Sequence, residues 1–189
     1  MLEELIQQDK ALFLMLNNLG TTSWDGFWMF MTNRFSSIPL YLFLAYISFK
    51  QFGSKRTLVL VLFVAAMIAT TNGLADVFKY GFQRLRPCYD TSINELMRLV
   101  KDSCGGKFGY FSAHAGNTMA VATFFSILLK RNIRHIGILL LVWAILVGYS
   151  RIYIGVHFPL DVFTGMVVGL FFGWLFAKLF IFGLTKISL

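Results

Sequence analysis

The stretch VFTGMVVGLFFGWLFAKLFIF, residues 162–182, contains a single charged residue, Lys178. A helix of about 20 mostly apolar residues spans the hydrocarbon core of a bilayer, so this stretch predicts a membrane-crossing helix. Further apolar runs precede it at Ile38–Phe49, Thr57–Thr71, Met119–Leu129 and Ile136–Val147. The chain is 57% hydrophobic and only 14% charged, against about 25% charged residues in soluble domains, which indicates a polytopic membrane protein.

These runs predict an all-α fold, a polytopic membrane helical bundle of about five to six transmembrane helices with an amphipathic N-terminal helix. The crossings that fit best are 37–53, 56–79, 112–130, 134–150 and 159–183. Apolar residues recur at helical spacing within Met1–Asn18, which predicts a helix along the membrane surface. The aromatic stretch Trp24–Phe30 forms an interfacial belt or, alternatively, part of an additional crossing. We expect a single domain over 1–189, with 1–35 as an interfacial segment and 36–189 as the bundle.

Basic residues set the expected orientation of the chain. They gather in two short joints between crossings, at Lys50, Lys55 and Arg56 and at Lys130, Arg131 and Arg134. The positive-inside rule places these joints in the cytoplasm, and the N-terminus and the loops 80–111 and 151–158 on the opposite side. His135, beside the second joint, is expected at the cytoplasmic interface. Orientation and anionic lipid explain the formal net charge of +8, so we expect no nucleic-acid partner.

Ionisable residues gather in three clusters at the ends of the predicted crossings on that opposite side. The clusters are KYGFQRLRP at 79–87, FSAH at 111–114 and SRIYIGVHFPLD at 150–161. Charged and titratable groups are costly at membrane depth, which makes them candidates for function. Two of the chain's 3 histidines lie in these clusters. With the expected topology, all of the clusters converge on one membrane face.

Together the clusters resemble the signature of the phosphatidic acid phosphatase type 2 superfamily. That signature is a lysine, six residues and Arg-Pro; then Pro-Ser-Gly-His; then Ser-Arg, five residues, His, three residues and Asp. The matching residues are Lys79, Arg86, Pro87, Ser112, His114, Ser150, Arg151, His157 and Asp161. Phe111 stands in place of the proline and Ala113 in place of the glycine. The resemblance implies a membrane lipid phosphatase that needs neither a metal nor another cofactor.

The chemistry of phosphoryl transfer favours the same residues. A transferring phosphoryl group spreads negative charge over its equatorial oxygens, and fixed cations stabilise that charge. Ser112 is placed to cap the crossing that follows it, so that free backbone N–H groups near Ala113 and His114 point at an anion. We therefore expect the phosphate to be bound by Lys79, Arg86, Ser112, Ala113 and Arg151.

The remaining matching residues are candidates for the catalytic steps. His157 is the expected nucleophile, which attacks phosphorus to give a phosphohistidine. Asp161 is expected to hold the other ring nitrogen and to stabilise the positive charge that develops. His114 is the expected general acid, which donates a proton to the leaving oxygen and later accepts one. No group of His, Cys and carboxylate residues has the spacing of metal ligands.

Neighbouring residues have structural interpretations. Asp76 precedes Lys79 by three positions and is expected to position it through an ion pair. Arg84 falls outside the matching positions and is interpreted as a loop charge that contacts lipid headgroups. Cys88 and Cys104 lie in one polar stretch, and both a disulfide and two free thiols are open to them.

The expected function is hydrolysis of a lipid phosphate or pyrophosphate in a bacterial inner membrane, with the site facing the periplasm or exterior. Undecaprenyl pyrophosphate is favoured, and phosphatidylglycerol phosphate and the phosphates of lipid A are further substrates that the resemblance implies. One alternative is phosphotransfer to an acceptor lipid or sugar through the same site. Another is a catalytically inactive membrane protein that binds a phosphorylated lipid. The superfamily is also similar in fold to vanadium haloperoxidases, an activity that membrane burial disfavours.

Overall fold

The computed structural model describes residues 1–130 and 133–186; Arg131 of the second basic joint and residues 187–189 lie outside the described residues. Within the described ranges the regular elements are helices. In chain order they are α1 (Leu2–Asn18), α2 (Thr22–Thr32), η1 (Arg34–Ser37), α3 (Ile38–Phe82), η2 (Pro87–Tyr89), α4 (Ala113–Leu129), α5 (Ile136–Tyr153) and α6 (Pro159–Lys186). The predicted all-α fold is confirmed.

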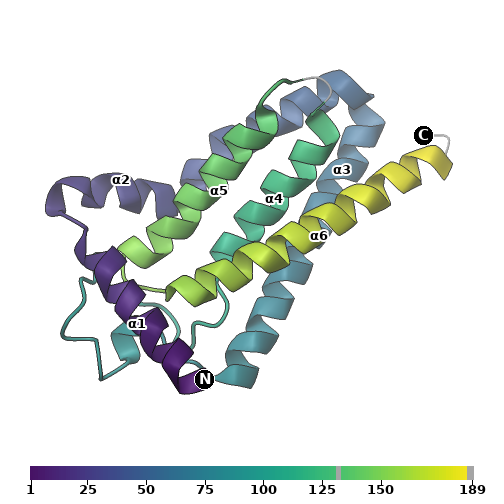
Figure 1. Cartoon of the computed structure of the whole chain (residues 1–189). Helices are drawn as coiled ribbons and strands as arrows, with labels where there is room; N and C mark the ends of the chain where they lie inside the picture. The colour runs from purple at the N-terminus through teal and green to yellow at the C-terminus, as the bar shows by residue number, and fades with distance from the viewer. Residues whose placement is uncertain (131–132, 187–189) are drawn as a thin grey trace.

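Helix α3 contains two of the predicted crossings. At Gly53 the backbone leaves helical geometry, with φ 77° and ψ 176°, and the chain reverses into two antiparallel arms (Figure 1). Glycine adopts a positive φ without the clash that a Cβ would cause. Leu44 of one arm and Leu60 of the other are buried in the same apolar cluster. The predicted boundary between the first two crossings is therefore confirmed.

Helix α4 lies at the centre of the bundle, and α6 is its main partner, followed by α5 (Figure 1). Glycines of α6 allow the two backbones to approach closely, as in other membrane helix pairs. A Cβ at Gly165 would lie 2.5 Å from the carbonyl oxygen of Ser112, and one at Gly173 would lie 2.5 Å from that of Ala120. This close packing fixes the start of α4, which carries Ser112 and the residues after it, beside the start of α6.

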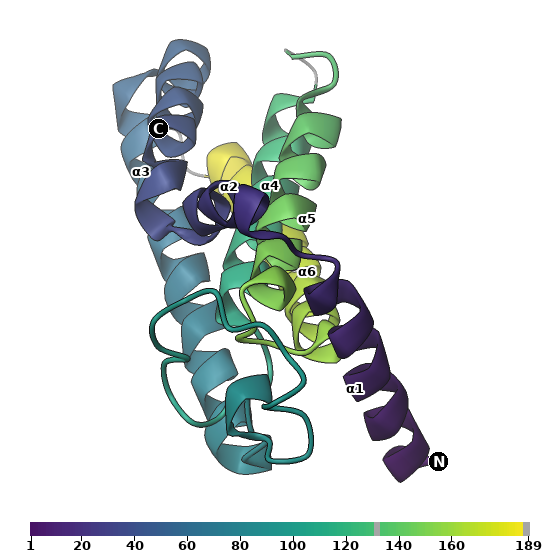
Figure 2. The same cartoon turned by 90° about the vertical axis from the view of Figure 1, so that its left-hand side faces the viewer.

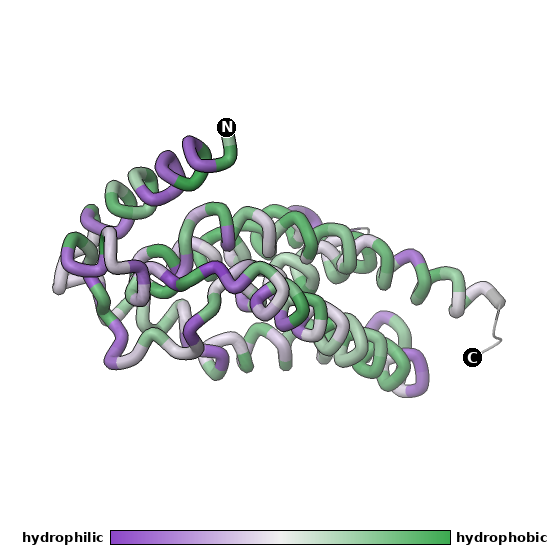
Figure 3. Tube along the Cα trace, turned by 90° about the horizontal axis from the view of Figure 1, so that it is seen from below, coloured by the Kyte–Doolittle hydropathy of each residue, from purple (hydrophilic) through white to green (hydrophobic). Residues whose placement is uncertain are grey.

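The long helices have the length and composition of membrane spans. Segments Arg34–Phe82, Ile136–Tyr153 and Pro159–Thr185 qualify, while α4 is shorter and apolar. Hydrophobic residues run along the long helices, and hydrophilic ones gather at their ends and along α1 (Figure 3). Helix α2 has 11 residues and therefore a length of about 16 Å, well short of the ~30 Å hydrocarbon core. The structure thus favours an interfacial α2 over the additional crossing.

One end of the bundle brings together the loop after α3, the α5–α6 connection and helix α1 (Figures 1 and 2). The turn at Gly53 and the C-terminal end of α6 lie at the other end. Cys88 and Cys104 are joined by a disulfide, which settles the choice left open by the sequence. The predicted convergence of the ionisable clusters on one end is confirmed.

Candidate active site

His157 lies in the short connection between α5 and α6 and is only 3% exposed. Its Nδ1 is 3.4 Å from Asp161 Oδ2, and its Nε2 is 3.3 Å from Arg86 Nη1. Because a guanidinium can only donate hydrogen bonds, Nε2 must be the acceptor. We therefore assign the neutral ring with its proton on Nδ1, directed at the carboxylate. The lone pair of Nε2 faces the cationic side of the site.

Asp161 accepts hydrogen bonds from several directions. It has no exposed surface and lies in the first turn of α6. Its Oδ2 also accepts the backbone N–H of Phe158 at 3.0 Å, and its Oδ1 accepts Arg84 Nη1 at 2.7 Å. The carboxylate is therefore fixed both by its own helix turn and by an arginine from the loop after α3.

The interpretation of Arg84 as a headgroup contact is wrong. Its side chain is 19% exposed and bridges Asp161 to Asp9 of α1. Neither partner is near it in the sequence, and Arg84 falls outside the matching motif positions. The structure thus adds Arg84 and Asp9 to the site, and no local sequence signal pointed to either.

Arg86 is held by backbone carbonyls around His157. Its Nε donates to Phe108 O and its Nη1 donates to Val156 O, each at 3.3 Å. Burial lowers the pKa of this guanidinium, which nevertheless stays protonated at neutral pH. The side chain therefore presents a positive charge at Nε2 of His157.

Gly109 is a third site residue that lies outside the motif positions. Its N–H donates to Arg84 O at 2.9 Å. A Cβ at this position would lie 3.0 Å from Arg86 Cγ, 3.3 Å from Asp161 Oδ2 and 3.6 Å from His157 Nδ1. The absence of a side chain here lets the loop backbone pass directly over the histidine and its carboxylate.

The protonation of His157, which the sequence left undecided, follows from its surroundings. Burial lowers the pKa of the imidazole well below 6.5, and the positive charges of Arg86, Arg151 and Lys79 act in the same direction. These effects outweigh the neighbouring Asp161. At neutral pH the ring is uncharged, which leaves its Nε2 lone pair available.

The FSAH cluster lies where α4 begins. Ser112 is the N-cap, as predicted, and its side chain accepts the N–H of Ala115 at 3.5 Å. Its own N–H donates to Asp161 O at 2.9 Å, which joins α4 to α6. By helix geometry the N–H groups of Ala113 and His114 have no partner within α4. They face the end of the bundle that carries His157.

Thr32, at the end of α2, contacts both His114 and Arg151. His114 Nε2 is 3.1 Å from Thr32 O, and Arg151 Nη1 donates to Thr32 Oγ1. The buried Nε of Arg151 has no hydrogen-bond partner among the described residues, which leaves a donor available to an anion. Helix α2 is therefore part of the site, a role that its sequence did not indicate.

Two further features complete the neighbourhood. Lys79 Nζ is 2.9 Å from Asp76 Oδ1, so the predicted ion pair is confirmed. A cavity of about 140 Å³ adjoins His114. Its lining also includes Arg34 and Asn117. Among residues 1–130 and 133–186, no group of three His, Cys, Asp or Glu side chains has the arrangement of a metal site.

The fold and the site define a class of protein: a helical membrane protein with a neutral, carboxylate-bound histidine facing a cationic pocket at one end of the bundle. The chain belongs to the PAP2 superfamily, which matches residues 57–182 and confirms the predicted resemblance. It is a membrane phosphatase of that superfamily.

Similar proteins agree with this assignment. The chain is 33% identical over 178 residues to a lipid A 4'-phosphatase of Bacteroides thetaiotaomicron, covering 93% of this chain and 78% of that protein. It is 29% identical over 170 residues to an undecaprenyl-diphosphatase of Sulfolobus acidocaldarius, covering 88% and 76%. The crystal structure of a PAP2-type phosphatidylglycerolphosphate phosphatase from Bacillus subtilis superposes with a TM-score of 0.74 at 23% identity, covering 97% and 89%, and shows the shared fold.

Proposed function

We propose that this protein hydrolyses a phosphorylated lipid through a phosphohistidine intermediate on His157, without a metal ion. The observations that support this most directly are the two contacts of the His157 ring, from which its tautomer is assigned. Its Nδ1–H is directed at Asp161 and its Nε2 lone pair at Arg86, so the free nitrogen faces a cation that would bind a phosphoryl oxygen.

In the binding step, a phosphoryl group displaces Arg86 from its contact with Nε2. Its oxygens bind Arg86, the available Nε of Arg151 and the N–H groups at the start of α4. Lys79 adds a third positive charge. Because the start of α4 and Arg151 are held in place by the fold, little reorganisation of these groups is needed as charge develops.

In the first chemical step, the Nε2 lone pair of His157 forms the N–P bond, and the bond from phosphorus to the leaving oxygen breaks. Asp161 stabilises the resulting imidazolium. His114, which takes up a second proton when the negatively charged phosphate binds beside it, donates that proton to the leaving oxygen and returns to the neutral form. To do so, its ring exchanges the hydrogen bond to Thr32 O for one to that oxygen. In the second step, water attacks phosphorus, the N–P bond breaks and His114 accepts the proton of the water.

The similar proteins suggest two lipid substrates. The Bacteroides relative supports a phosphomonoester of the lipid A type, which we place first because its identity and coverage are the higher. The Sulfolobus relative supports undecaprenyl diphosphate, the substrate favoured by the sequence. We place the site at the periplasmic or outer face of a bacterial inner membrane, since the described residues of the basic joints lie at the opposite end of the bundle. We treat residues 1–189 as one catalytic domain.

The test is phosphate release from lipid A, undecaprenyl diphosphate and phosphatidylglycerol phosphate in detergent with EDTA. We expect His157→Ala to abolish release and His114→Ala to reduce it by about 10²- to 10⁴-fold. His135→Ala is the matched control, because this third histidine lies at the other end of the bundle and should leave the rate unchanged. A labelled, acid-labile phosphoenzyme should form in wild type and not in His157→Ala.

Other results would contradict the proposal in distinct ways. Strict dependence on a metal, or a phosphoenzyme in His157→Ala, would refute the mechanism. Phosphate appearing on an added lipid or sugar instead of in solution would indicate a phosphotransferase. Binding of a phosphorylated lipid with no turnover would indicate an inactive binding protein.

A further inference from the structure

Arg84 joins two buried carboxylates that lie far apart in the sequence. Its Nη1 donates to Asp161 Oδ1 at 2.7 Å, and its Nη2 donates to Asp9 Oδ2 at 2.5 Å. The other oxygen of Asp9 accepts the backbone N–H of Leu160 at 2.9 Å. The guanidinium also lies over the Phe158 ring, with its Cζ 4.4 Å from the ring centroid. These contacts hold the guanidinium in one orientation.

Asp161 depends on this arginine. Its Oδ2 is engaged by His157 and by the N–H of Phe158, and Arg84 is the partner of its Oδ1. With no exposed surface, the carboxylate has no water to replace a lost donor. Without Arg84 the carboxylate would rotate or take up a proton, and either change disturbs the hydrogen bond to Nδ1 of His157.

Asp9 is an unusual residue for the buried face of a surface helix. It is 6% exposed and shares that face of α1 with Phe13 and Asn17, four and eight residues later. Burial raises the pKa of its carboxyl, so the charged form carries a cost that an apolar residue would avoid. In its buried position Asp9 accepts hydrogen bonds from Arg84 and from the N–H of Leu160 at the start of α6.

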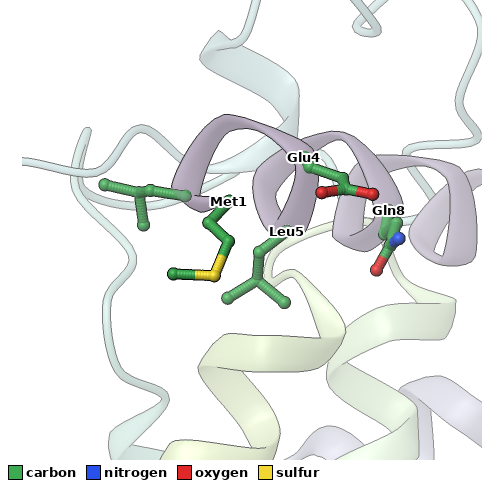
Figure 4. A pocket seen from close by; sticks show the side chains of 5 residues that line it. Met1, Glu4, Leu5 and Gln8 are labelled. Carbon is green, nitrogen blue, oxygen red and sulfur yellow. The ribbon is translucent and has the colours of Figure 1, made fainter.

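Phe13 in the second half of α1 packs against Phe158 and Val162, whereas the first half of α1 packs loosely against α6. A cavity of about 430 Å³ lies between this half and the start of α6, lined by Leu5, Gln8, Asp9 and Leu12 of α1 and by Pro159, Leu160 and Phe163 of α6. Figure 4 shows Leu5 and Gln8 projecting from the first turns of α1, where with Met1, Leu2 and Glu4 they also line a second, separate pocket. Asp9 therefore supplies a specific, polar link where the apolar contact is incomplete.

We infer that Asp9 and Arg84 are positioning residues: with Asp161 they form an ion chain through which α1 holds His157 in its reactive orientation. This inference rests on the proposed role of His157. Arg84 contacts the carboxylate oxygen that does not face the histidine, so it acts on the reaction through Asp161.

The test compares Asp9→Asn, Arg84→Gln, Arg84→Lys and the double variant Asp9→Asn/Arg84→Gln with wild type. The matched control is Lys10→Gln. Lys10 also links α1 to the loop after α3, through a 2.7 Å ion pair with Asp90, but does not touch the chain that ends at Asp161. If α1 served only as a structural clamp, Lys10→Gln and Asp9→Asn would have similar effects.

We expect Asp9→Asn and Arg84→Gln to lower kcat by roughly 10- to 100-fold with KM nearly unchanged, since a small misplacement of a reacting group has effects of that size. The double variant should lose little more than Arg84→Gln alone, because both changes break one chain. Arg84→Lys should fall between wild type and Arg84→Gln, because one ammonium keeps the charge but spans both carboxylates poorly. Lys10→Gln should stay within about twofold of wild type.

A second readout needs no substrate. With only 3 histidines in the chain, ¹⁵N spectra of labelled protein can report the tautomer of His157. We expect the Nδ1–H form in wild type and Lys10→Gln, and a loss of that form in Arg84→Gln. Should Arg84→Gln not fold, Asp9→Asn and Arg84→Lys decide by the same measurements.

The inference is overturned if Asp9→Asn and the folded Arg84 variants match Lys10→Gln in kcat and keep the wild-type tautomer. If wild type itself releases no phosphate from any lipid, the proposed function fails, while the tautomer comparison still decides whether the ion chain positions His157.

Discussion

Replacing Asp161 with asparagine tests the central electrostatic element of the site with almost no change in side-chain volume. The carboxylate accepts donors from His157, Phe158 and Arg84. An amide oxygen can face only one side. If it faces His157 and Phe158, the NH₂ group points at the guanidinium of Arg84. The negative charge of Asp161 is lost in either orientation, so the imidazolium of the proposed mechanism would have no counter-charge.

The magnitude follows from the distance between the two groups. A full charge on the ring 3.4 Å from Asp161 Oδ2 gains about 5 kcal/mol at an effective dielectric constant of ~20. This energy corresponds to roughly 4,000-fold in rate. The positive charge of Arg84 on the other oxygen offsets part of it. We therefore expect Asp161→Asn to lower kcat by about 10³-fold, with a smaller change in KM.

The assay is the initial rate of phosphate release from the best lipid substrate in mixed micelles with EDTA. Asp102→Asn is the matched control, since it makes the same chemical change at an exposed loop position and should leave kcat unchanged. Thermal unfolding of both variants separates loss of catalysis from loss of the fold. A decrease of less than about tenfold for folded Asp161→Asn would refute the electrostatic argument.

Four more outcomes are expected. Gly109→Ala should lower kcat at least tenfold while the protein stays folded, because its Cβ would lie 3.0 Å from Arg86 Cγ and 3.6 Å from His157 Nδ1; steady-state kinetics check this. The pKa of His157 is depressed, so protonation of His157 should lower kcat/KM only below pH 6.5; an acidic limb with its midpoint at or above pH 6.5 in the pH–rate profile would contradict this. The same depression predicts lower stability as pH falls below 6.5, since the unfolded chain then binds a proton that the folded chain does not. Replacing Cys88 and Cys104 with serine should lower the unfolding temperature, since the cross-link closes a loop with a sequence separation of 16 and is worth about 3 kcal/mol; differential scanning fluorimetry measures the shift.

The sequence was sufficient to predict the helices, because the signals for a membrane span are local. Each apolar run of suitable length must satisfy its backbone hydrogen bonds internally, and a helix does so within one segment. The reversal at Gly53 was predicted between two crossings for the same reason. The aromatic residues of α2 did not decide whether this segment crosses the membrane, since such residues suit both a membrane interface and a span.

Part of the site could also be predicted from the sequence. Lys79, Arg86, Ser112 and His157 follow from motif positions and from the cost of placing polar groups at the ends of apolar helices. The structure brings their clusters to one end of the bundle, and it confirms the N-cap at Ser112 and the ion pair at Lys79. Their catalytic roles are the subject of the experiments proposed above.

Only the tertiary structure decided which distant residues complete the site. Arg84 lies 75 positions from Asp9 and 77 from Asp161, and Thr32 lies 82 positions from His114. No periodicity or spacing encodes such pairs, because a salt bridge depends on where two side chains meet after the helices pack. The sequence by itself therefore determined the helices and the motif residues, since both depend on local properties of the chain. Packing determined the partners that hold those residues in place, since hydrogen bonds and ion pairs act over a few ångströms in space, whatever the separation along the chain.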